Sequence, residues 1–397
     1  MLNPNLSKLW TLISKDRYLY FVTRLANSLA GIFLSYLIIR FQDKSTYAEL
    51  AQIISLSTVL VALSDFGYLK TVQIDAHQSK IGFRDLESTF TIILKASSLF
   101  VIITALTFVF LGYKIQLVLV ALFLLLNYIK SYKYLAQNKL FLNALFQGII
   151  FTLILVLTAI ISDNFWPDLT VIILILTVTL LLSFIFFKNA RTNKLNYFLQ
   201  NKRRSLNIYV THVSGILLGN LDILIFGILV PAEVLSDYIV ITRMSKFIFL
   251  IQNIINQSFS KDINGHLATD SPKEALVLLR RLSLYILTAG VAMSLGFVFF
   301  GNELLKYWDI HNSIVPLILS AVLLTCTSSL GLISDYLIYI GNEVFVRRLS
   351  VVSVILTVPA YLIVGHNGSL LYLVGTFGGT LLLVNLFKLW KIRSLNI

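Results

Sequence analysis

The sequence predicts an all-α polytopic membrane protein, with twelve transmembrane helices arranged as two six-helix bundles around a central cavity. Of its 397 residues, 57% are hydrophobic and only 13% are charged. The apolar residues form stretches of about 20, the length that a helix needs to cross the hydrocarbon core, and a soluble core does not require such runs. Twelve stretches of this kind begin near Tyr18, Tyr47, Phe90, Ile115, Phe141, Asp168, Ser205, Leu235, Arg281, Ile314, Arg347 and Ser369.

The four tryptophans agree with these boundaries, because none falls in the middle of a predicted span. Indole rings prefer the headgroup region of a bilayer, where an apolar ring and a polar N–H are both accommodated. The residues concerned are Trp10, Trp166, Trp308 and Trp390.

The basic residues behind the formal charge of +13 are unevenly distributed among the predicted loops, and this distribution predicts the orientation of the protein in the membrane. With a cytoplasmic N-terminus, most of the 32 basic residues fall in cytoplasmic segments. The opposite face receives only Arg40, Lys44, Lys114 and Lys306. An excess of Lys and Arg marks cytoplasmic loops, so we expect both termini inside and no nucleic-acid partner.

The most basic loop divides the chain into halves, with six predicted spans on either side. We therefore predict an N-terminal six-helix lobe at 1–187, a basic cytoplasmic connector at 188–204 and a C-terminal six-helix lobe at 205–397.

The first span carries a polar face that includes a charge. Arg24, Asn27 and Ser28 share this face with Gly31 and Ser35 at helical spacing. A charge near the bilayer centre costs about 2.5 to 3.5 kcal/mol, so such a face is expected to contact protein or water. The alternative is ordinary helix packing, with the Arg24 side chain extending to the cytoplasmic boundary.

The eighth span carries a stronger polar face, which Arg243, Lys246, Asn253 and Gln257 share. Arg243 and Lys246 repel each other unless an anion lies near them. Asp222, at a similar depth in the seventh span, is a candidate partner for Arg243, and that pair would leave Lys246 available for a ligand anion. A further intramembrane cation, Lys95, lies about one and a half turns into its span, so we expect it to reach the interface.

Motifs for catalysis and cofactor binding are absent from the sequence. It contains no paired His and Cys ligands, no nucleophile elbow and no Walker loop, and its five histidines are scattered. We therefore predict no catalytic residues, no metal and no cofactor. The predicted outer loops are short, whereas a polysaccharide polymerase would need catalytic residues on a substantial outer loop. With these functions set aside, secondary transport or lipid flipping remains as the expected function.

Several short segments resemble a known family. Residues 220–227 read Asn-Leu-Asp-Ile-Leu-Ile-Phe-Gly, and Tyr238 leads to Arg243 after a short acidic loop. Tyr47-Ala48 opens the second span and Asp65-Phe66-Gly67 closes it. In these features the chain is similar to the polysaccharide (O-antigen) flippases, whose superfamily also holds multidrug and toxic-compound extruders and lipid II flippases. It departs at Ala48, where the family often has glycine, and at 260–262, where proline is frequent.

The resemblance implies alternating access in the bacterial cytoplasmic (inner) membrane. Its substrate would be an undecaprenyl-pyrophosphate-linked oligosaccharide, carried from the cytoplasmic to the outer leaflet. Membrane lipids, a polysaccharide polymerase and chain-length proteins would be its partners. Physical reasoning agrees, because a hydrated path lined by amides, hydroxyls and fixed cations lowers the barrier for a pyrophosphate and its sugars.

Two other functions remain as alternatives. The first is an ion-coupled multidrug extruder of the same superfamily, although a cation site favours acidic residues and Asp222 is the only acid deep in a predicted span. The second is a membrane polysaccharide polymerase.

Overall fold

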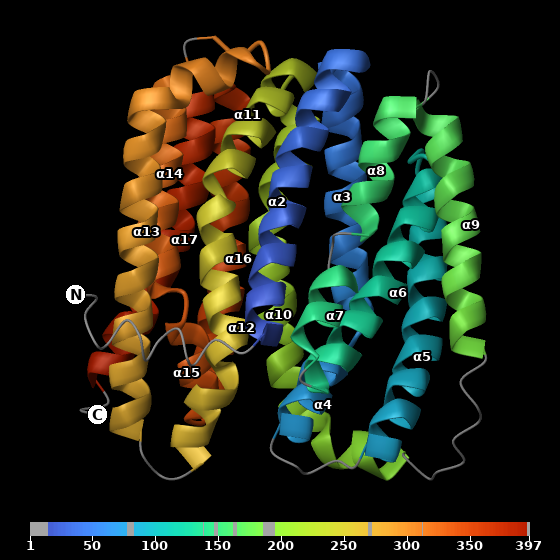
Figure 1. The fold of residues 1–397 in the computed structure, drawn as a ribbon, viewed down its shortest axis with the longest axis vertical. Helices are drawn as coiled ribbons and strands as arrows, with labels where there is room; N and C mark the ends of the chain where they lie inside the picture. Colours follow the sequence, from blue (N-terminus) through green and yellow to red (C-terminus); the bar gives the residue numbers. More distant parts are fainter. Residues whose placement is uncertain are drawn as a thin grey trace.

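The described part of the computed structural model is entirely helical (Figure 1). It comprises residues 15–77, 83–137, 139–146, 150–161, 165–185, 195–268, 272–311 and 313–394. The helices are α2 (Lys15–Phe41), α3 (Lys44–Ser64), α4 (Tyr68–His77), α5 (Phe83–Phe110), α6 (Gln116–Ala136), α7 (Leu140–Ala144), α8 (Ile150–Ile161), α9 (Phe165–Ile185), α10 (Leu195–Leu229), α11 (Ala232–Ser245), α12 (Phe247–Ala268), α13 (Pro272–Lys306), α14 (Ile314–Leu330), α15 (Ile333–Tyr339), α16 (Glu343–Asn367) and α17 (Leu370–Ser394).

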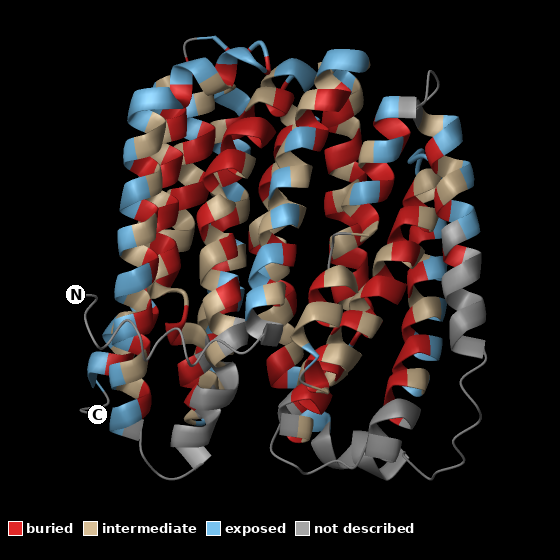
Figure 2. Ribbon diagram, viewed as in Figure 1, coloured by how far each residue is buried: buried red, intermediate tan, exposed pale blue. Residues whose placement is uncertain are grey.

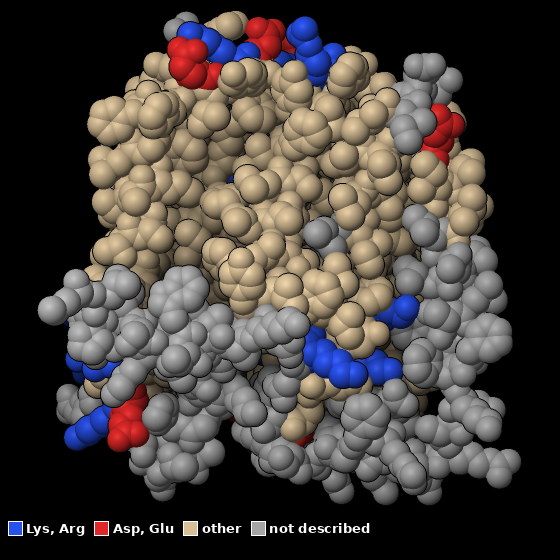
Figure 3. Space-filling model, viewed as in Figure 1, with Lys and Arg blue, Asp and Glu red and all other residues tan. Residues whose placement is uncertain are grey.

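The apolar helices confirm the predicted fold class. Among the described residues, eight helices are long and apolar enough to cross a membrane, and four shorter apolar helices accompany them at Ile150–Ile160, Trp166–Ile175, Phe247–Asn256 and Ile314–Leu330. Their outward faces carry exposed side chains (Figure 2), including large apolar ones such as Phe299 and Ile355. On the face drawn in Figure 3, charged side chains gather at the top and again toward the bottom, and the broad band between them is almost free of charged residues. This surface suits hydrocarbon rather than water.

Two of the predicted spans in the C-terminal half are interrupted at described residues where the sequence gives little warning. The eighth span divides into α11 and α12 at Lys246, and the tenth divides into α14 and α15 at Gly331 and Leu332. Proline, the strongest predictor of a helix break, is absent from both positions. Contacts with neighbouring helices therefore decide where these helices end. At Gly331, for example, the Gln252 side chain of α12 occupies the space where a Cβ would lie.

The two halves of the chain meet through a small set of helices. Contacts between the N-terminal half (α2–α9) and the C-terminal half (α10–α17) run mainly through α2, α3 and α4 on one side and α10, α11 and α12 on the other. Residues 195–204, predicted as connector, form the first part of α10, which continues into the seventh span. The remainder of the predicted connector, 188–194, lies outside the described residues.

The two ends of the bundle differ in charge. At one end α2 stops and α3 begins with Lys44, so we name it the Lys44 end. At the other end, the lower one in Figure 1, α3 passes into α4 and α17 terminates. We name this the basic end for the cations that the helices place there, namely Lys70, Lys202, Arg203, Arg280, Arg281, Arg347, Arg348, Lys388, Lys391 and Arg393.

The turn from α3 to α4 joins the two halves at the basic end. The Gly67 N–H donates to the Asp65 carboxylate at 2.6 Å, and Phe66 and Gly67 both have positive φ, +50° and +75°. Gly67 lies directly against α10, where a Cβ would come within 2.8 Å of the Tyr209 backbone nitrogen. The Tyr209 hydroxyl in turn donates to the Leu63 carbonyl at 3.0 Å. Glycine is thus required both for its conformation and for its lack of a side chain.

Substitution of Gly67 tests this packing. We expect Gly67→Ala to lower the Tm of the detergent-solubilised protein much more than Gly341→Ala does, as followed by tryptophan fluorescence. Both positions have positive φ, which costs an L-residue about 1 to 2 kcal/mol, but a Cβ at Gly341 meets no atom within 4 Å. Equal shifts in the two variants would show that α10 does not press on this turn.

Candidate functional site

A cavity of about 260 Å³ lies between the two halves, about midway along the bundle. Helices α2, α3 and α8 line it from the N-terminal half, and the junction of α11 and α12 lines it from the C-terminal half. We call it the central cavity. Its lining residues are Asn27, Ser28, Gly31, Ile32, Leu34, Ile54, Phe151, Thr152, Leu155, Arg243, Lys246 and Phe247. They include two cations and no carboxylate.

Arg243 reaches across from α11 to the N-terminal half. Its Nη1 atom donates to the Gly31 carbonyl of α2 at 3.3 Å. Its guanidinium carbon lies 5.5 Å from the centroid of the Tyr47 ring, which is buried on α3. A cation over an aromatic face is stabilised without losing its charge. Arg243 therefore remains a positive group with N–H donors beside the cavity.

Lys246 occupies the break in the eighth span. It terminates α11, with its N–H donating to the Thr242 carbonyl at 2.7 Å, and α12 starts at the next residue. The last carbonyls of a helix carry partial negative charge, which favours an ammonium group there. The Lys246 Nζ atom also lies 4.4 Å from the centroid of the Phe377 ring of α17. The break thus brings the ammonium group to the wall of the cavity.

The acidic partner of the cavity cations is Asp222 of α10, and it pairs with Lys246. The Lys246 Nζ atom lies 3.7 Å from Asp222 Oδ2, and the Tyr238 hydroxyl donates to the same oxygen at 2.6 Å. Asp222 is completely buried, whereas about a quarter of the Lys246 side chain is exposed. Part of the Lys246 side chain is consequently accessible, and it lines the cavity, whereas the carboxylate is not accessible.

The predicted pair of Asp222 with Arg243 is therefore wrong. That prediction compared only the depths of the two residues along their helices. Arg243 instead contacts Gly31 of α2 and the Tyr47 ring of α3, and Lys246, at the break, lies next to Asp222. Lys246 is accordingly paired, contrary to the prediction that it is left without a partner.

The other predicted site residues divide into three groups. Asn27 and Ser28 line the central cavity. Arg24 lies one turn closer to the basic end, buried and outside that lining, with its guanidinium 5.9 Å from the Tyr20 ring centroid. Among the described residues its Nε atom has no hydrogen-bond partner. Asn253 is exposed on α12, and the side chain of Gln257 lies outside the described part.

Sequence reasoning missed one wall of the cavity and the aromatic partners of both cations. Phe151, Thr152 and Leu155 of α8 form that wall, and nothing in this strongly apolar segment distinguishes them. Tyr47 and Tyr238 were noted only as family features, whereas in the structure they contact Arg243 and Asp222. No candidate metal centre, defined as three or more His, Cys, Asp or Glu side chains together, occurs in the described residues.

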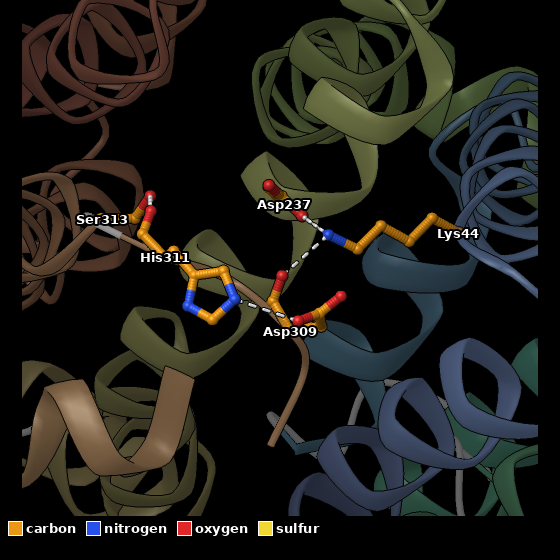
Figure 4. Close-up of polar contacts among 5 residues, drawn as sticks. All are labelled: Lys44, Asp237, Asp309, His311 and Ser313. Atoms are coloured by element: carbon orange, nitrogen blue, oxygen red, sulfur yellow. Dashed lines mark hydrogen bonds and ion pairs between the residues drawn. The ribbon is translucent and has the colours of Figure 1, made fainter. Parts of the chain in front are cut away.

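The two halves are joined at the Lys44 end, beyond the cavity (Figure 4). The Lys44 Nζ atom donates to Asp237 Oδ1 of α11 at 2.9 Å and to the Asp309 carbonyl at 3.1 Å. The Trp308 indole donates to Ser35 Oγ of α2 at 3.0 Å. One ion pair and two hydrogen bonds thus link residues of opposite halves at this end.

Comparison with solved structures shows the fold. Neither a family model nor a curated protein matches the sequence. An outward-facing multidrug resistance MATE family transporter of the MOP superfamily has 13% identity and a TM-score of 0.58, over 97% of this chain and 98% of that one. An inward-facing transporter of the same description has 13% identity and a TM-score of 0.56, over 95% of this chain and 99% of that one. A eukaryotic MATE transporter has 12% identity and a TM-score of 0.54, over 96% of this chain and 94% of that one.

The chain therefore has the fold of these MATE transporters. The helical transporter fold that the resemblance implied is thus confirmed, whereas the flippase family itself is not tested by these structures.

A double-mutant cycle tests the pairing of Lys246 with Asp222. We expect Lys246→Met alone to destabilise the protein, because it leaves a buried carboxylate without its cation, and Asp222→Asn in the same chain to restore much of the loss. The coupling energy should be about 1 to 3 kcal/mol, measured by SDS-induced unfolding in mixed micelles. The matched control combines Asp222→Asn with Arg243→Gln, whose effects should be additive. Coupling in the control and additivity in the first pair would contradict the assignment.

Proposed function

We propose that this protein is a flippase for a lipid-linked oligosaccharide. It moves an oligosaccharide carried on a polyprenyl pyrophosphate, an O-antigen or related surface-polysaccharide unit, from the cytoplasmic to the outer leaflet of a bacterial inner membrane by alternating access. The head group passes through the central cavity while the polyprenyl tail stays in lipid. Surface-polysaccharide synthesis, with its polymerase and chain-length proteins, is the process that it serves.

The observation that carries this proposal is the charge of the central cavity. Arg243 and Lys246 line it, together with Asn27 and Ser28, and no carboxylate occurs among the lining residues that the structure describes. The carboxylate of Asp222 lies nearby but is completely buried. It pairs with Lys246 and accepts a hydrogen bond from Tyr238. Such a cavity favours an anion over a cation by direct Coulomb interaction, which is strong where water is scarce.

The two cations offer complementary contacts to a pyrophosphate. A guanidinium presents a planar fork that matches two phosphate oxygens, whereas an ammonium acts as a point charge. The amide of Asn27 and the hydroxyl of Ser28 supply neutral donors on the opposite wall. At about 260 Å³ the cavity lies below the roughly 300 to 1,000 Å³ usual for ligand pockets, so the halves must separate before sugars can pass.

The second candidate is an ion-coupled multidrug extruder, and the fold comparison favours it. The similar solved structures are described as multidrug resistance or MATE transporters. An extruder of cationic compounds would need an accessible carboxylate, and Asp222 becomes one only if Lys246 leaves it. The two candidates therefore differ in the charge of the compound that the protein moves.

The deciding experiment uses proteoliposomes containing a fluorescent oligosaccharide-pyrophosphate-polyprenol, whose outer-leaflet fraction is measured by dithionite quenching. To keep Asp222 from being left unpaired, Lys246→Gln is made together with Asp222→Asn. We expect this variant and Arg243→Gln each to slow flipping about tenfold or more, since a hydrogen bond to a charged group contributes about 1.5 to 3 kcal/mol. Lys95→Gln, which removes an exposed lysine of α5, is the control and should flip at the wild-type rate.

The same vesicles separate the two candidates. Wild-type protein that leaves the pyrophosphate lipid in place but exports a cationic dye would refute the flippase and support the extruder. Flipping at the wild-type rate in the variants that lack Arg243 or Lys246 would refute a path that depends on these two cations.

Alternating access predicts that fixing the halves at the Lys44 end stops transport. In a Cys326→Ser background, we expect a bifunctional thiol cross-linker between Lys44→Cys and Asp237→Cys to abolish flipping, and reduction to restore it. The matched control is the pair Lys114→Cys and Glu49→Cys, which replaces an ion pair of 2.7 Å within the N-terminal half. Cross-linking there should leave the rate unchanged. Full activity with the first pair linked would mean that this end never opens.

A further inference from the structure

A buried carboxyl group lies at the basic end, where α3 passes into α4. Asp65 is 1% exposed, and its Oδ1 atom accepts the Gly67 N–H at 2.6 Å. Its other oxygen, Oδ2, is buried and has no hydrogen-bond partner among the described residues. A carboxylate removed from water is unfavourable unless donors or a cation compensate its charge. These surroundings therefore suit the neutral, protonated form of the group.

Helix α10 of the C-terminal half packs against α3 and α4 of the N-terminal half on either side of Asp65. Just before Asp65, the Leu63 carbonyl accepts a hydrogen bond from the Tyr209 hydroxyl of α10 at 3.0 Å. After it, Thr71 Oγ1 accepts a hydrogen bond from Ser205 Oγ of α10 at 3.0 Å. Because α10 contributes to the burial of the turn, separation of the two halves at the basic end would expose Asp65 to water.

The titratable groups closest to Asp65 in its electrostatic environment are two tyrosines. Tyr128 of α6 and Tyr209 of α10 lie within range of its charge. The Tyr128 hydroxyl in turn contacts the Tyr132 hydroxyl at 3.5 Å and the Nε2 atom of His212 on α10. The helices around the turn also carry charged side chains, none of which forms an ion pair with Asp65 in the described part of the chain: Lys70 and Asp75 on α4, Lys95 on α5, Lys130 and Lys133 on α6, and Lys202 and Arg203 on α10.

Burial gives this carboxyl group an affinity for protons in the neutral range. Asp65 follows the last residue of α3, and burial raises its pKa from the ordinary value of 3.8 to about 7. The Gly67 N–H lowers the pKa and offsets only part of this increase. In separated halves water would reach the group, and its pKa would return toward the ordinary value. The joined halves thus bind the proton more tightly, so low pH favours the joined form and high pH favours the separated form.

We propose that Asp65 is a proton-binding site, and that a proton bound there holds the two halves together at the basic end. Release of the proton leaves a buried charge under α10, which destabilises the packing of α10 on the turn and favours separation. The proton exchanges with water at the basic end, so the site responds to the pH on that side of the membrane. The inference rests on the alternating access of the proposed function but not on its substrate.

The test follows the separation of the halves by double electron–electron resonance, with the full chain in nanodiscs. In a Cys326→Ser background, spin labels are attached to Lys139→Cys in the N-terminal half and Arg348→Cys in the C-terminal half, both exposed positions. We expect the ratio of separated to joined molecules to rise about tenfold per pH unit from about pH 5 to about pH 7 and to level off above it. Asp65→Asn keeps an oxygen for the Gly67 N–H but is neutral at every pH, so it should stay joined throughout.

The matched control is His212→Gln. A histidine ordinarily titrates at about pH 6.5, and this one contacts Tyr128, so its titration must be distinguished from that of Asp65. We expect His212→Gln to keep the pH response of the wild type. If Asp65→Asn fails to fold, Asp65→Ser takes its place, because it also removes the titrating group and leaves a hydroxyl that can accept the Gly67 N–H.

Wild-type distances that do not change with pH, or a pH response that persists in the neutral variant, would overturn the inference. A response that disappears in His212→Gln and persists in the neutral variant would assign the titration to the histidine. The flipping assay reports separately on the proposed function. A chain that flips the lipid without this pH response would retain that function and lose only the proton site. A chain that shows the response but flips nothing would do the reverse.

Discussion

The organisation of the C-terminal half depends on one constraint, the compensation of a buried carboxylate in the middle of a bilayer. Asp222 has no access to solvent, and an isolated ion in hydrocarbon is too unfavourable to persist. Its compensation comes from the Tyr238 hydroxyl and the Lys246 ammonium group, one on α11 and one at its end. Because Lys246 also contacts the Phe377 ring, this one interaction joins α10, α11 and α17.

The same arrangement explains how positive charge is kept beside the central cavity although no described lining residue is acidic. Arg243 is stabilised by a carbonyl and an aromatic ring, neither of which carries a formal charge. Lys246 shares its charge with a carboxylate that lies on the far side of it from the cavity. Aromatic and carbonyl contacts hold a cation in place while leaving its field available to a ligand. For the proposed function, such a cavity would select its ligand by sign as well as by shape.

The sequence was sufficient for the fold class and for much of the central cavity, because apolar length and helical periodicity are properties of single segments. They indicated twelve spans and the polar faces around Asn27 and Arg243. The pairing of Asp222 with Lys246 could not be predicted, since it depends on a helix break that no local residue signals. The α8 wall was missed for a related reason. A segment of apolar residues has the same pattern whether it faces a lipid, another helix or a cavity.

Helix α8 has a consequence for the way in which the central cavity communicates with its surroundings. One face of α8 lines the cavity through Phe151, Thr152 and Leu155, while Leu153 and Leu157 on its other face are exposed. At this point a single helix thickness separates the central cavity from the lipid-facing surface. Displacing α8 would open a lateral portal, through which a substrate could thread its tail without the tail ever crossing a polar space. A water-soluble cargo would gain nothing from such a thin partition.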